Sequence, residues 1–82
     1  MDEKRIFEEM VNILKDYAKN QDVLAKATMD THILNDLKVN SARLVDVIIR
    51  CEDVYGISID DEEADVIRTI GDAVKVIKQK LG

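Results

Sequence analysis

Residues 41–56 read SARLVDVIIRCEDVYG, and their apolar side chains recur with the period of an α-helix. The main apolar stripe, at spacings of three and four, consists of Leu44, Val47, Ile48, Cys51 and Tyr55. Gly56 follows directly, and glycine often ends a helix because it adopts the left-handed conformation without strain. The segment predicts an amphipathic helix from about Ser41 to Tyr55 that turns one face toward a core.

Two further segments, one on each side of this helix, show the same period. Near the N-terminus, one helical face is formed by Ile6, Phe7, Met10, Ile13, Leu14 and Tyr17. Near the C-terminus, another face is formed by Ile70, Ala73, Val74, Ile77 and Leu81. Thr69, with Asp72 three residues later, marks the start of this last helix, since threonine caps helices and an acid is favourable in the first turn. The sequence thus predicts three main helices.

The connections between these helices carry weaker signals. Residues 61–67 have room for one or two helical turns, and residues 57–59 alternate like a strand but are too few, without a partner, to form a sheet. Residues 19–39 form a connection that is long for a compact domain, and such loops are usually functional or contain an unrecognised element. We therefore predict an all-α fold: a small three-to-four-helix bundle with a long loop between the first two main helices.

The composition is that of one small folded domain with an acidic surface. Of the 82 residues, 46% are apolar and 35% are charged, which favours a single domain over residues 1–82. Seventeen acidic against twelve basic residues give a net charge of −5, which argues against binding to nucleic acid. A single cysteine excludes an intrachain disulfide, and one cysteine with one histidine offers no zinc site. We expect no bound metal.

The N-terminus and the lengths of the apolar runs indicate a cellular location. Residues 1–5, MDEKR, are charged and lead directly into a helical pattern, so no secretory signal is expected. No apolar run approaches the roughly 20 residues that span a bilayer. We expect a cytoplasmic protein without a membrane span, and a monomer.

The start of the central helix carries the candidate functional residue. Residues 33–44 read ILNDLKVNSARL, with Asn40 at the position of a helix N-cap and Ser41 in the first turn. A serine there is either an ordinary helix-start residue or an exposed hydroxyl that another protein reaches, beside a helix N-terminus that favours an anion. His32 lies nine residues before Ser41, and the sequence shows no nucleophile paired with a general base. We therefore do not expect an enzyme.

The whole second half of the chain resembles the acyl carrier proteins, the phosphopantetheine-bearing carriers of fatty-acid, polyketide and related pathways. In that family an Asp-Ser-Leu motif opens the second helix after a loop similar to residues 34–37, LNDL. Residues 52–59, EDVYGISI, and 60–64, DDEEA, look like the family's acidic-aromatic-Ile and Pro-Asp-Glu-Glu-Ala stretches. Residues 69–74, TIGDAV, look like the start of its last helix, and no gap is needed after residue 33.

The resemblance implies a carrier that performs no chemistry itself. A phosphopantetheinyl transferase, or holo-carrier synthase, would move 4′-phosphopantetheine from coenzyme A to Ser41. Acyl or related groups would then travel as thioesters on that arm between acyl-transferring and synthase enzymes of fatty-acid, polyketide or specialised lipid biosynthesis. Apolar residues of the bundle would shelter the acyl chain, and the expected lining is Leu44, Ile48, Cys51, Tyr55, Ile59, Ile67, Ile70 and Val74.

Three residues around the motif depart from the family pattern. Asn40 stands in place of the usual Asp, Ala42 in place of Leu or Met, and Lys38 in place of Gly. Asn keeps a capping oxygen but loses the charge that favours the helix dipole by roughly 0.3–1 kcal/mol. These changes indicate a specialised carrier with a dedicated or permissive transferase.

The helix that follows Ser41 has two further faces of interest. Ala42, Val45 and Ile49 form a second apolar stripe, which is either a docking face or a set of scattered surface residues. Charges at spacings of three and four, which include Arg43 and Arg50, either pair within the helix or meet a partner. We hypothesise that the two arginines disfavour general fatty-acid enzymes. The resemblance implies a partner-binding set of Ala42, Arg43, Val45, Asp46, Ile49, Arg50, Glu52 and Asp53.

Two other functions stay open at this point. One is a carrier-like helical subunit that is never modified and acts only through protein interactions. The other is an unrelated helical adaptor. Modification of Ser41 by a transferase would separate both from a carrier.

Overall fold

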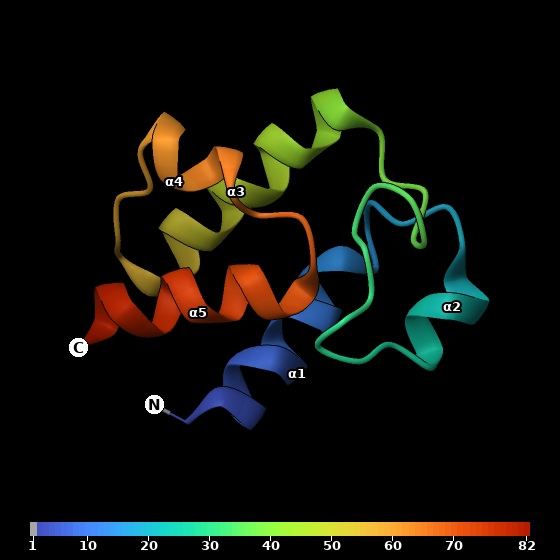
Figure 1. The fold of residues 1–82 in the computed structure, drawn as a ribbon, viewed down its shortest axis with the longest axis horizontal. Coiled ribbons are helices and arrows are strands. Elements are labelled where there is room, and N and C mark those ends of the chain that lie inside the picture. The colour runs from blue at the N-terminus through green and yellow to red at the C-terminus, as the bar shows by residue number, and fades with distance from the viewer. Residues whose placement is uncertain (1) are drawn as a thin grey trace.

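The computed structural model describes residues 2–82, and this range contains five helices. They are α1 (Glu3–Leu14), α2 (Gln21–Ala25), α3 (Ser41–Tyr55), α4 (Asp61–Asp65) and α5 (Ile70–Leu81). In Figure 1, α5 crosses the middle of the molecule with α1 below it and α3 above it, while α2 and the loop after it form the right-hand end. The all-α prediction is confirmed: within residues 2–82, the one strand-like feature is a single bridge between His32 and Thr69.

The first helix and the long loop differ from the sequence-based prediction. α1 ends at Leu14, and the stripe residue Tyr17 lies in the following turn, where the amides of Tyr17 and Ala18 donate to the carbonyl of Leu14 at 3.0 and 2.8 Å. The loop contains the short helix α2, which the prediction missed. Five residues with one buried side chain, Leu24, are too few to show a helical period.

The core is centred on α1 and α5. Leu14 of α1 and Val74 of α5 are fully buried. In α3, by contrast, the buried residues are Val47 and Cys51. Three predicted core-facing residues of α3, namely Leu44, Ile48 and Tyr55, are half-buried. Leu44 and Tyr55 pack against the core and Ile48 lines an apolar cavity beside it, so all three face inward as predicted but are only partly covered.

The long loop packs into the fold as a layer of its own. Ile33 and Leu37 are almost completely buried. The loop is tied to the start of α5 by backbone hydrogen bonds, in which Ile70 donates to Thr31 at 3.0 Å and Gly71 donates to Met29 at 2.8 Å. A Cβ at position 71 would lie 2.8 Å from the Met29 carbonyl oxygen, so this close approach requires glycine.

None of the helices within residues 2–82 has the length and apolar character needed to cross a bilayer.

Candidate functional site at the start of α3

Ser41 is the first residue of α3 and is exposed. The preceding residue, Asn40, is the N-cap: its backbone is extended, and its Oδ1 accepts a hydrogen bond from the amide of Ala42 at 2.8 Å. Within residues 2–82, no protein group forms a hydrogen bond with the Ser41 hydroxyl. The hydroxyl is therefore presented to solvent at the positive end of a 15-residue helix, where an attached anion is favoured.

The turn before this helix contains a strained residue. Lys38 has a φ of 58°, in the left-handed region, and within residues 2–82 it is the one non-glycine residue with positive φ. This conformation costs a residue with a Cβ roughly 1–2 kcal/mol. Lys38 is also the position where the acyl carrier pattern has glycine.

Two surface grooves meet at Asn40. The larger one, about 780 Å³, lies between the turn before α2 and the turn before α3, and it is lined by Lys19, Asn20, Gln21, Asp22, Leu34, Lys38, Val39 and Asn40. The smaller one, about 540 Å³, is lined by Asp16, Tyr17, Lys19, Asn40, Ala42, Arg43 and Asp46. Sequence reasoning missed both, because residues 16–22, from the turn after α1 to the start of α2, reach the motif from a distant part of the chain.

The outer face of α3 is apolar in its middle and mixed in charge at its edges. Val45 and Ile49 are 56% and 49% exposed, and Ala42 is exposed beside them. Arg43 pairs with Asp46 at 3.5 Å along the helix. Arg50 instead pairs with Asp16 in the turn after α1 at 3.7 Å. The expectation of pairing within the helix is therefore correct for Arg43 and wrong for Arg50, because the turn after α1 brings a closer carboxylate.

Beneath α3 lies an apolar cavity of about 10 Å³, close to the smallest space that holds a water molecule. Among the expected lining residues, the cavity has Leu44, Ile48, Cys51, Ile59 and Ile67. The other three are not part of it: Tyr55, Ile70 and Val74. Additional lining comes from Met10, Ile33, Val47, Ala73 and Ile77. The helical stripes did not show this set because the cavity lies where three helices and three loop segments meet.

Two residues expected in the pocket, Cys51 and Tyr55, make specific contacts with α1. Burial raises the pKa of Cys51 to about 12, and its Sγ lies 3.3 Å from the Sδ of Met10, so the thiol is held in its unreactive form. Tyr55 donates a hydrogen bond to Glu9 of α1 at 2.6 Å. Burial, followed by this contact, raises the pKa of the Tyr55 hydroxyl. Tyr55 thus fastens the end of α3 to α1.

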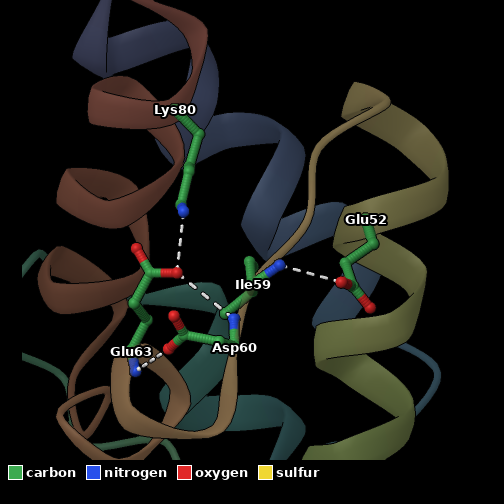
Figure 2. A network of polar contacts seen from close by, with 5 residues as sticks. All are labelled: Glu52, Ile59, Asp60, Glu63 and Lys80. Atoms are coloured by element: carbon green, nitrogen blue, oxygen red, sulfur yellow. Dashed lines mark hydrogen bonds and ion pairs between the residues drawn. The ribbon is translucent and has the colours of Figure 1, made fainter.

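The acidic segment after α3 supports the fold through hydrogen bonds (Figure 2). The Glu52 carboxylate, an expected partner contact, accepts from the amide of Ile59 at 2.8 Å. Asp60 and Glu63 form a capping box at the start of α4, and Lys80 of α5 lies 2.7 Å from the Glu63 carboxylate.

Across residues 2–82, no group of three or more His, Cys, Asp or Glu side chains is arranged to hold a metal ion. Asp53 remains exposed on the helix.

The hydrogen bonds of His32 lie within its own turn. His32 Nδ1 accepts a hydrogen bond from the amide of Asn35 at 3.3 Å, and the His32 amide donates to Asp36 at 2.8 Å. The side chain is therefore engaged within its own turn.

Comparisons with known proteins place the chain in a family. No family model matches it. It is 36% identical to an acyl carrier protein of Coprothermobacter proteolyticus over 99% of this chain and 96% of that protein. It is 37% identical to an acyl carrier protein of Lactobacillus acidophilus over the full length of both. The fold matches the crystal structure of an acyl carrier protein from Thermotoga maritima with a TM-score of 0.81 and 25% identity, over 99% of this chain and 92% of that one. The resemblance found in the sequence is thereby confirmed, and the chain belongs to the acyl carrier protein family.

Proposed function

We propose that Ser41 carries a 4′-phosphopantetheine arm and that the protein transports acyl or related groups as thioesters on its thiol. The observation that carries the proposal is the exposed Ser41 hydroxyl, without a protein partner in residues 2–82, at the first residue of α3 in a chain of this family. A transferase needs an accessible hydroxyl, and the helix N-terminus favours the phosphodiester that forms. The transferase supplies the catalytic groups, and Ser41 supplies the acceptor oxygen.

Partner enzymes would dock on the outer face of α3. The exposed side chains there are Ala42, Arg43, Val45, Asp46, Ile49, Arg50 and Asp53. Exposed apolar residues next to an attachment site provide buried area for a partner without loss of an existing contact. Glu52 is left out of this docking face because its carboxylate holds the Ile59 amide.

The proposal extends to pathway and location. The carrier would serve fatty-acid, polyketide or specialised lipid synthesis in the cytoplasm, as a monomer. The cavity of about 10 Å³ would have to expand to admit an acyl chain. Burial of apolar chain in it would favour that expansion by roughly 25 cal/mol per Å².

Intact-mass measurement tests the proposal. The protein is incubated with coenzyme A and a broad-specificity phosphopantetheinyl transferase, in parallel with Ser41→Ala and with Ser58→Ala, another exposed serine, as the matched control. We expect a gain of one phosphopantetheine group in the parent and in Ser58→Ala, and no gain in Ser41→Ala. Failure of the parent to gain mass with every transferase of its own organism would instead favour an unmodified interaction subunit.

A further inference from the structure

The larger groove beside Ser41 is formed by two turns that lie against each other. The amides of Lys19 and Asn20 both donate to the carbonyl of Leu37, each at 3.1 Å, which holds the turn before α2 next to the turn before α3. The groove of about 780 Å³ opens along this contact, and Asn40, the neighbour of Ser41, is part of its wall. A group attached to Ser41 thus starts one residue away from the lining of the groove.

The charge of the groove is opposite to that of the molecule. Two lysines, Lys19 and Lys38, and one acid, Asp22, line it, so its side chains sum to +1 in a chain with a net charge of −5. Within residues 2–82, no carboxylate lies within 4.0 Å of either lysine ammonium. The two cations are therefore free to pair with an anion near Ser41.

The groove also offers amide groups for hydrogen bonding. Asn20 and Asn40 use their Oδ1 atoms as helix caps, to the amides of Val23 at 3.1 Å and Ala42 at 2.8 Å. Gln21 uses its Nε2 to donate to the carbonyl of Ala18 at 2.6 Å. The opposite ends of these three side-chain amides, two donors and one acceptor, have no protein partner within residues 2–82.

We propose that this groove is the resting site of the phosphopantetheine arm, with Lys19 and Lys38 pairing with its phosphodiester. The inference rests on the proposed attachment at Ser41. The arm carries one negative charge at the phosphodiester, two amides, and a dimethyl carbon that suits the apolar wall of Leu34 and Val39. The cavity beneath α3 offers the polar part of the arm no polar group, and burial there would leave its amides unsatisfied.

Paramagnetic relaxation tests this placement in the loaded protein. A nitroxide is attached to the thiol of the arm, and Cys51 does not compete because it is buried. We expect the amide signals of residues 19–22 to be broadened more strongly than those of residues 59–67, which border the apolar cavity. In Lys19→Gln/Lys38→Gln we expect the broadening at residues 19–22 to fall by at least half. Lys15→Gln/Lys26→Gln is the matched control, since both lysines are exposed outside the groove, and it should leave the pattern unchanged.

A second measurement uses the arm as a free molecule. Free 4′-phosphopantetheine, titrated into the unloaded protein, should shift the amide signals of residues 19–22 and 38–40. Two exposed ion pairs are worth roughly 0.2–1 kcal/mol each, so the double variant should bind about twofold to thirtyfold more weakly than the control.

The outcomes separate the two proposals. Strongest broadening at residues 59–67, or an unchanged pattern in the double variant, overturns the groove while a normal gain in mass keeps Ser41 as the attachment site. No gain in mass with any transferase overturns the attachment, and the resting site with it.

Discussion

The α1–α5 pair and α3 differ in how completely their apolar side chains are buried. Ile6 and Leu14 of α1, with Ile70 and Val74 of α5, are completely buried, and the start of α5 is tied to the long loop by backbone hydrogen bonds. The 15-residue α3 buries only Val47 and Cys51 and exposes Val45 and Ile49. We call the buried α1–α5 pair the platform and the exposed side of α3, with Val45 and Ile49, the working face.

The difference teaches where this fold can move. Segments with few buried apolar contacts open at lower free-energy cost than the core. The proposed acyl chain would need such an opening to enter beneath α3, since the cavity there measures only about 10 Å³. Tyr55 ties the end of α3 to Glu9 of α1, whereas the Asn40 cap bonds only to the start of the helix itself.

The largest expected effect is in the comparison of two leucines. Leu14→Ala in the platform should lower the free energy of unfolding by about 2–5 kcal/mol, because a fully buried side chain leaves a cavity. Leu44→Ala in the half-buried layer under α3 should lower it by only about 1–2 kcal/mol. Urea unfolding followed by circular dichroism measures both. Equal losses would contradict the distinction between platform and working face.

An intermediate effect is expected at the cap of α5, which anchors the platform. Asp72 accepts hydrogen bonds from the amides of Thr69 at 3.0 Å and Arg68 at 3.1 Å, and the Thr69 amide contributes most to lowering the pKa of the Asp72 carboxyl. Because the folded pKa is below the unfolded value of about 3.9, this contribution to stability is present above that value. It is lost as the pH falls through the folded pKa.

Asp72→Asn keeps an acceptor oxygen but replaces two charge-assisted hydrogen bonds with weaker neutral ones, so it should lower the free energy of unfolding by about 0.5–2 kcal/mol at pH 6 and by clearly less at pH 3. Urea midpoints at the two pH values measure the change. Asp65→Asn is the control, since Asp65 is exposed and accepts no side-chain hydrogen bond within residues 2–82. A cost of Asp72→Asn that is equal at both pH values would show that the carboxylate charge does not matter at this cap.

The smallest expected effect is at Lys38, in the segment that leads into α3. Lys38→Gly should raise the free energy of unfolding of the unloaded protein by a few tenths to about 1 kcal/mol, since relief of the left-handed strain exceeds the added entropy of the unfolded chain. Lys26→Gly is the control: its φ is −111°, so glycine should destabilise by about 0.4–1 kcal/mol. A loss of stability in Lys38→Gly would indicate that its side chain holds the turn.

Most helix positions were predictable because their signals are local. The capping residues Asn40 and Thr69 and the terminating Gly56 mark helix ends within a few residues of sequence, and α3 and α5 begin where expected. α2 was not predictable, since a single turn and a half with one buried residue has no period to detect. The partner of Arg50 was also missed, because Asp16 reaches it only through the path of the turn after α1.

By itself, the sequence determined the helical class, the acidic balance, the resemblance to a family and the placement of Ser41 at a helix start. Each of these depends on residue types at short spacings. The tertiary structure alone decided how small the cavity is, which ten residues surround it, and that two lysines from separate turns flank the groove beside Ser41. These features arise where segments distant in sequence meet, and the spacing of residues along a single helix carries no information about such meetings.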